Sequence, residues 1–285
     1  DINFKVQNEN ILSIIGPSGA GKTVLLRMLG GLEDPDDGDV MYYVDGEWRD
    51  IEIPGISRMK IRSKLGFMHQ EFSLVHYSTV LSQLATRLGY KNQDIVKDAQ
   101  ERARKIGIGE ELLDSFYLLT DLPESEAKER LRQVGLDGEI LNDLFPRFPE
   151  TATKEAVADI FDSLDLDMDI LYRKSYELSG GQRQRAYIAM VIAQDTEYVL
   201  LDEPTNYLDV EHIEWLKRYL QEYENAFILI SHDIPFLNSV INIIYHMENQ
   251  ELNRYVGDYD KFMLFGNLDE FFEVLSASNY VGIWC

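Results

Sequence analysis

The sequence predicts an α/β fold in which helices cover a mostly parallel sheet. Three short apolar segments carry this prediction, because buried parallel strands are short and rich in β-branched residues. They are residues 11–15, 198–201 and 227–230. Each segment ends in polar or glycine-rich residues, and ligands of open α/β sheets bind at the carboxyl ends of the strands. We therefore expect one ligand site at which the three strand ends meet.

The composition fits a globular protein with a hydrophobic core, since 45% of the 285 residues are hydrophobic and 27% are charged. No apolar run approaches the roughly 18–20 residues of a membrane-spanning helix. We expect a cytoplasmic protein; if it serves a membrane, it does so from the periphery and through a partner. The single cysteine, Cys285, favours a reducing compartment. The sequence begins at Asp1, with a strand-like pattern at residues 2–6, and we expect a fragment or a trimmed chain.

The charge balance is strongly acidic, with 27 Lys and Arg against 50 Asp and Glu and a net charge of −23. Such a surface repels the phosphates of nucleic acids, so we do not expect a nucleic-acid partner. Solubility, or adaptation to a salty host, explains this charge more simply than a specific basic partner does.

A glycine-rich loop follows the first apolar segment, and a helix-like pattern follows the loop. The loop has the spacing G-x-x-x-x-G-K-T and consists of Gly16, Pro17, Ser18, Gly19, Ala20, Gly21, Lys22 and Thr23. Its glycines allow backbone amides to converge on phosphate oxygens at a helix N-terminus. Lys22 supplies a cation for the β- and γ-phosphates, and Thr23 supplies a hydroxyl for Mg²⁺. A chance match is disfavoured by the flanking strand and helix.

Two acids end the second apolar segment, and a histidine follows the third. Asp202 is placed to hold Mg²⁺, and Glu203 to act as the general base that polarises the attacking water. The alternative is a helix N-terminal turn that favours acids. His232 lies where the γ-phosphate should be, and its imidazole can orient the water. A structural histidine is the alternative there.

A Ser-Gly-Gly sequence opens another helix-like segment. Ser179 is expected to be the N-cap, with Gly180, Gly181 and Gln182 opening the helix and offering a second anion site. With these motifs in order, the sequence resembles the ABC (ATP-binding cassette) ATPase family, whose fold is that of P-loop NTPases. Residues 16–23 resemble its Walker A motif, residues 198–203 its Walker B motif and residues 178–182 its signature.

The resemblance implies further residues, ligands and partners. Gln70 resembles the Q-loop glutamine that senses the metal and the γ-phosphate, and it is carried over as a metal-binding and catalytic residue. Asp209 resembles the D-loop aspartate at the nucleotide, and His232 the switch histidine. ATP and Mg²⁺ are the implied ligands. The family hydrolyses ATP between the Walker A loop of one cassette and the signature of another, so a second cassette is implied, as a homodimer or a related subunit.

We expect four segments along the chain. Residues 1–90 form the N-terminal part of the core, residues 91–175 an enlarged helical subdomain, residues 176–265 the signature helix with Walker B and the switch, and residues 266–285 a tail. Proline and charge patterns predict helices within the second segment. These helices are expected at residues 94–106, 110–119, 124–134, 138–144 and 154–164.

The amino-acid sequences of individual segments resemble different subfamilies. Residues 66–77, 117–124 and 168–178 resemble the ATP-dependent activation component of methyl-coenzyme M reductase. Residues 202–209 and 255–262 resemble the ABC-F proteins, which are soluble translation factors, and residues 182–193 resemble importer ATPases. Two functions therefore stay open. One is an ATPase that drives a membrane permease or a reductase-activation complex, and the other is an ABC-F-like switch on the ribosome, which the acidic charge disfavours.

Overall fold

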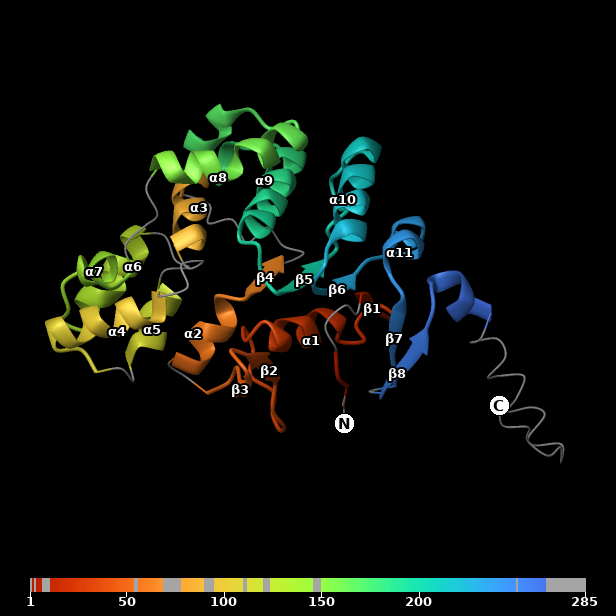
Figure 1. Cartoon of the computed structure of the whole chain (residues 1–285), viewed down its shortest axis with the longest axis horizontal. Coiled ribbons are helices and arrows are strands. Elements are labelled where there is room, and N and C mark those ends of the chain that lie inside the picture. Colours follow the sequence, from red (N-terminus) through yellow and green to blue (C-terminus); the bar gives the residue numbers. More distant parts are fainter. Residues whose placement is uncertain are drawn as a thin grey trace.

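The computed structural model describes residues 2, 4–6, 11–53, 56–68, 78–89, 95–109, 112–119, 124–145, 150–249 and 251–264. Among these residues, a six-stranded sheet has the order β4-β5-β6-β1-β7-β8 (Figure 1). Its neighbours are parallel except for the antiparallel edge pair β7–β8. The predicted α/β fold with a mostly parallel sheet is confirmed. The strands are β1 (Ile11–Ile15), β4 (Leu65–Met68), β5 (Tyr198–Asp202), β6 (Ala226–Ile230), β7 (Ile243–Glu248) and β8 (Glu251–Val256).

The apolar strands are buried on both faces, and alternate residues enter different cores. Leu200 and Ile228 pack in a core on one face of the sheet, whereas Leu201 and Leu229 pack in the larger core on the other face. This alternation follows from the two-residue period of a strand. Helices α1 and α2 contribute to the smaller core, and helices α3, α8, α9, α10 and α11 contribute to the larger one (Figure 1). The helices are α1 (Lys22–Leu29), α2 (Ile56–Arg62), α3 (Val80–Gly89), α8 (Glu150–Ser163), α9 (Gly180–Ala193), α10 (Val210–Glu222) and α11 (Ile234–Val240), with 3₁₀ turns η2 (Met168–Tyr172) and η3 (Ser175–Glu177).

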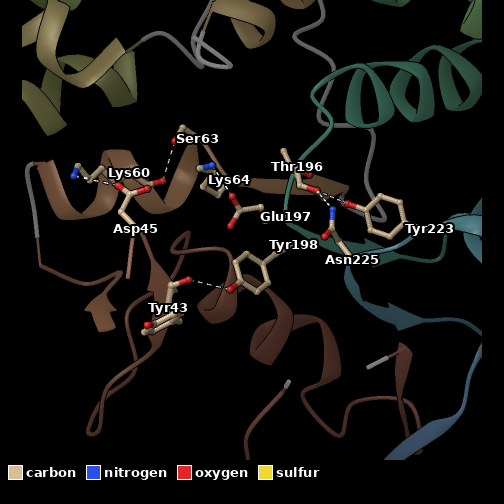
Figure 2. A network of polar contacts seen from close by, with 10 residues as sticks. All are labelled: Tyr43, Asp45, Lys60, Ser63, Lys64, Thr196, Glu197, Tyr198, Tyr223 and Asn225. Atoms are coloured by element: carbon tan, nitrogen blue, oxygen red, sulfur yellow. Dashed lines mark hydrogen bonds and ion pairs between the residues drawn. The ribbon is translucent and has the colours of Figure 1, made fainter. Parts of the chain in front are cut away.

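A separate antiparallel hairpin, β2 (Met41–Val44) with β3 (Glu47–Asp50), is fastened to the sheet by polar contacts at the amino ends of the strands. Figure 2 shows this network. The Tyr198 hydroxyl donates to the Tyr43 carbonyl at 3.1 Å, and Lys64 pairs with Glu197 at 2.5 Å. The network therefore holds the edge of the sheet opposite to the carboxyl ends, where the ligand site is expected.

A group of four helices has a small core of its own. These helices are α4 (Ile95–Ile106), α5 (Leu113–Leu119), α6 (Glu124–Gln133) and α7 (Ile140–Leu144). Their core includes Phe116 and Leu144, and Met59 of α2 joins it to the sheet domain. Helices lie close to all five ranges expected between residues 94 and 164. The division of the chain at residues 91–175 stays a prediction, and α8 packs with α9 in the larger core.

The strand expected at residues 2–6 was wrong for the residues that the structure describes there. Residues 2 and 4–6 form no strand, and the Phe4 ring instead packs against Tyr245 with centroids 5.2 Å apart. Gln70, Cys285 and the tail at residues 266–285 lie outside the described residues. Within the described ranges, no helix combines the length and the apolar character needed to cross a bilayer.

Candidate functional site

The glycine-rich loop connects the central strand β1 to the N-terminus of α1. Gly19 and Gly21 have φ values of 81° and 99°, which only glycine adopts readily. Lys22 is buried at 8% exposure, and its Nζ donates to the carbonyls of Gly16 and Pro17 at 2.8 and 2.9 Å. The loop therefore wraps around its own cation, in the arrangement that a triphosphate site requires.

Gly16 packs directly against the neighbouring strand β7. A Cβ atom at Gly16 would lie 2.2 Å from the backbone carbonyl oxygen of Met247, and the φ of Gly16 is 152°. Backbone at that distance cannot move aside without separating β1 from β7, because Ile15 pairs with His246 in the same ladder. The loop's position thus depends on the absence of a side chain at this residue.

We expect Gly16→Ala to lower the free energy of unfolding by about 3 kcal/mol or more, through overpacking and backbone strain. Gly19→Ala is the matched control, because its φ is also positive but nothing lies within 4 Å of the added methyl group. That control should cost only about 1–2 kcal/mol. Equilibrium urea unfolding measures both values, and equal losses would show that the contact with Met247 carries no energy.

Two adjacent acids lie at the carboxyl end of β5. Asp202 is 1% exposed and Glu203 is 5% exposed. Both oxygens of Asp202 and the Oε1 of Glu203 are buried without a completed hydrogen bond from the residues that the structure describes. Burying unsatisfied carboxylate oxygens is costly, so an arrangement of this kind fits a site that binds a cation or a reacting water.

Glu203 has an unusual backbone conformation for a non-glycine residue, with a φ of 51°. Its amide donates to the Ile230 carbonyl at 2.8 Å, which fixes the turn against β6. Left-handed residues of this kind cost of order 1–3 kcal/mol and occur preferentially at functional sites. The turn directs the Glu203 carboxylate toward the end of β6.

Burial is the main cause that raises the pKa of both acids. Lys22, His232 and the nearby Thr23 hydroxyl act in the opposite direction on the pKa of Asp202. The backbone amide and ring of His232 partly offset the rise at Glu203, whereas the charge of Asp202 adds to it. A carboxylate whose pKa is raised toward neutrality is a better general base than an exposed one.

His232 follows β6 and faces the acids across the end of the sheet. Its amide donates to the Glu203 Oε2 at 3.2 Å, and its Nε2 lies 3.4 Å from the Glu203 Oε1. The imidazole is 71% exposed, so it is open to a ligand in front of the strand ends. The structure therefore brings Lys22, Thr23, Asp202, Glu203 and His232 to one edge of the sheet, as expected from the sequence.

The Ser-Gly-Gly segment opens α9 as predicted. The Ser179 Oγ accepts from the Gln182 amide at 3.2 Å, and the Gln182 Oε1 accepts from the Ser179 amide at 3.1 Å. Gly180 and Gly181 lie against Tyr207, and a Cβ at Gly181 would be 3.2 Å from its carbonyl oxygen. The side chains of Ser179 and Gln182 thus bond to each other's backbone amides, and among the described residues no hydrogen bond connects them with the phosphate loop.

Asp209 is the N-cap of α10. Its Oδ1 accepts from the His212 amide at 3.1 Å and from the ring Nδ1 at 2.6 Å. These bonds lower the pKa of Asp209, with the backbone bond as the largest cause. Its assignment as a nucleotide-binding residue stays a prediction, as do those of Ser179–Gln182. Gln70 lies outside the described residues.

Comparison with known proteins decides the family. A sequence model of the ABC transporter family matches residues 1–206. The chain belongs to the ABC family of ATP-binding cassettes. The cassette is 39% identical over 265 residues to the uncharacterized ABC transporter ATP-binding protein YfmM of Bacillus subtilis, covering 92% of this chain and 44% of that protein. It is 38% identical over 244 residues to the uncharacterized ABC transporter ATP-binding protein MJ1662 of Methanocaldococcus jannaschii, covering 84% of this chain and 43% of that protein.

The chain is also similar to an F family member and to a solved cassette structure. ABC transporter F family member 5 of Arabidopsis thaliana is 27% identical over 268 residues, covering 93% of the cassette and 34% of that protein. The cassette spans less than half the length of these curated relatives. A solved dimer of the ATP-binding cassette MJ0796 bound to ADP and phosphate has a TM-score of 0.62 at 21% identity, over 90% of this chain and 89% of that one. That likeness supports the fold.

The sequence analysis did not identify the residues whose hydrogen bonds support the site residues. The Gln184 side chain donates to the Pro204 carbonyl at 2.9 Å, which anchors the turn after Glu203 to α9. His212 binds Asp209, and its signal was available, because an aspartate N-cap followed three residues later by a polar side chain is a capping pattern. The contact of Met247 with Gly16 had no sequence signal, since it depends on the order of the strands.

Proposed function

We propose that this cassette hydrolyses ATP to ADP and phosphate with Mg²⁺, and that it does so as a pair with a second cassette. One observation carries the proposal. Both carboxylate oxygens of Asp202 and Oε1 of Glu203 are buried without a completed hydrogen bond among the described residues, and they lie at the strand ends near Lys22 and Thr23. This combination of a phosphate loop and carboxylates at one edge is suited to phosphoryl transfer.

The residues present fit a magnesium ion. The two buried oxygens of Asp202 and the adjacent Thr23 hydroxyl are hard ligands of the kind that Mg²⁺ prefers. We propose that Asp202 and Thr23 hold the ion, together with Gln70. When bound, Mg²⁺ neutralises charge on the β- and γ-phosphate oxygens.

The remaining side chains divide the chemistry between them. Glu203 accepts the proton of the attacking water as the oxygen–phosphorus bond forms, and the bond from the γ-phosphorus to the bridging oxygen breaks toward ADP. His232, within reach of Glu203, orients this water and donates to the γ-phosphate. The amides of residues 16–21 and the Lys22 ammonium bind the phosphates.

The position of the signature supports the proposed pairing. Ser179 and Gln182 hydrogen-bond with each other at the start of α9. Among the described residues, neither of them bonds to the phosphate loop of the same chain. We propose that the signature of a second cassette, whether another copy or a related one, completes each site. ATP would then bias a two-state opening and closing of the pair.

For the process that ATP hydrolysis would drive, we propose two classes of partner. A membrane permease, with the cassette on its cytoplasmic side, agrees with relatives named as transporter ATP-binding proteins. The resemblance of the middle segment to the methyl-coenzyme M reductase component finds no support in these relatives. An ABC-F-like ribosomal switch is the second candidate, favoured by relatives named F family members that match 93% of the chain. Co-purification of a permease or of ribosomes would choose between the two.

The proposed chemistry is tested by steady-state hydrolysis with varied magnesium. We expect activity that disappears with EDTA and returns with Mg²⁺. Asp202→Asn should need about tenfold or more Mg²⁺ for half-maximal rate, because a charged ligand to the ion is lost. Asp258→Asn, beyond β8, is the control and should match the wild type. An unchanged magnesium requirement in Asp202→Asn would remove Asp202 from metal binding.

A further inference from the structure

A chain of side chains connects the segment after β5 with the helix that carries the signature. Asp209 Oδ1 lies 2.6 Å from Nδ1 of His212, and Nε2 of the same ring lies 2.7 Å from Nη1 of Arg185 in α9. Arg185 continues to Asp165 at 3.7 Å. His212 is only 8% exposed, so this is an interior connection between α9 and α10.

The chemistry of the three groups fixes the direction of each bond. A guanidinium can only donate, so Nε2 of His212 must be the acceptor. The proton of the neutral ring is then on Nδ1, which donates to the Asp209 carboxylate. The imidazole thus acts as a two-ended connector, with an acceptor for the signature helix and a donor for Asp209.

This connector sets the orientation of the Asp209 carboxylate. The hydrogen bonds from the His212 amide and from the His212 ring both end at Oδ1. The other oxygen has no hydrogen bond within the described part of the chain, and the side chain is 67% exposed. Tyr207 and Val210 beside it are 66% and 77% exposed. The Asp209 side chain is therefore exposed to solvent, while its Oδ1 is fixed by His212.

The N-terminal half of α9 holds the same segment at two more points. Gln184 donates to the Pro204 carbonyl at 2.9 Å, and Gly181 packs so closely on Tyr207 that an added Cβ would lie 3.2 Å from the Tyr207 carbonyl oxygen. Three contacts thus link the first turns of α9 to residues 204–209. We therefore expect a displacement of α9 at the signature to shift residues 204–209 as well.

We propose that His212 is a positioning residue that makes the Asp209 segment follow the signature helix. Arg185 moves with α9, His212 transmits this movement to Asp209, and the Asp209 oxygen that faces outward is placed for the partner cassette only when the signature is engaged. The inference rests on the proposed function, since it concerns how engagement at the signature reaches the D-loop. Hydrolysis should therefore depend on both ends of the imidazole.

Two substitutions separate those ends. His212→Asn keeps an amide donor near the Nδ1 position but does not extend to Arg185. His212→Gln places an amide oxygen near the Nε2 position, where it can accept from Arg185, but puts a methylene opposite Asp209. If His212 served only as a polar capping side chain, one of these two variants would retain wild-type activity. Glu214→Gln, on an exposed face of the same helix, is the matched control.

We expect both variants to lower kcat about tenfold or more, with KM and thermal stability near the wild type, because a small misplacement far from the chemistry can cost up to about 100-fold. Arg185→Gln should lower kcat similarly, and Arg185→Gln with His212→Asn should be no worse than either single change, because they break one connection. Wild-type kcat in either His212 variant, or losses that multiply in the double variant, would overturn the inference. A wild-type cassette that hydrolyses no ATP would instead overturn the proposed function, and this inference with it.

Discussion

Replacing Glu203 with glutamine is expected to lower kcat about 10²- to 10⁴-fold, because the amide cannot take the proton of the attacking water. Nucleotide affinity should remain close to that of the wild type. Glutamine has nearly the same shape, and its carbonyl oxygen can still accept from the His232 amide, which now bonds the Glu203 carboxylate at 3.2 Å. Removing a negative charge beside the phosphates also favours the bound state. Single-turnover hydrolysis and equilibrium titration with Mg-ATP measure the two quantities.

The control for this substitution is Glu224→Gln, which removes an exposed carboxylate after α10 and should leave both quantities unchanged. Hydrolysis by Glu203→Gln at a rate within about threefold of the wild type would assign the general base to another group. Loss of binding with folding intact would show that the carboxylate supports the nucleotide site itself, contrary to the role proposed for it.

Replacing Lys22 with alanine is expected to weaken Mg-ATP binding about 10- to 100-fold, since a hydrogen bond to a charged group contributes about 1.5–3 kcal/mol. The buried ammonium donates to two carbonyls of the phosphate loop, at 2.8 and 2.9 Å. In the complex, we expect it to exchange these weak acceptors for phosphate oxygens. Equilibrium titration with Mg-ATP gives the dissociation constant directly.

Lys217→Ala is the matched control, because Lys217 lies on α10 and pairs with the exposed Glu214 of the same helix. The Lys22 variant also loses two hydrogen bonds of the unliganded loop, so thermal unfolding must be measured beside affinity. A stable Lys22→Ala protein with wild-type affinity would contradict the phosphate-binding role of the loop.

Much of the fold follows from local sequence in this protein. The segments 11–15, 198–201 and 227–230 are apolar on both faces, and each of them is a buried parallel strand. Ser179 caps α9 as expected, because serine before glycine and glutamine offers both halves of a capping box. The reactive side chains at the strand ends are likewise brought together, since parallel strands place their carboxyl ends at the same edge.

The parts that sequence could not supply depend on long-range contacts. Strand β7 lies beside β1 although the two strands are far apart in the sequence, and this neighbour explains why Gly16 must lack a side chain. The left-handed backbone of Glu203 has no local signal either, because it is imposed by the bond to Ile230. His212 could be recognised as a capping partner of Asp209, but its contact with Arg185 required the packing of α10 on α9.

A crystal structure of Glu203→Gln with Mg-ATP tests whether the phosphate loop and the two acids share one triphosphate. We expect the triphosphate to lie along residues 16–23 with Lys22 on its β- and γ-phosphates, Asp202 and Thr23 to face the ion, and the signature of another cassette to cover the nucleotide. A triphosphate bound away from the edge shared by β1, β5 and β6, or an ion remote from Asp202, would contradict this expectation.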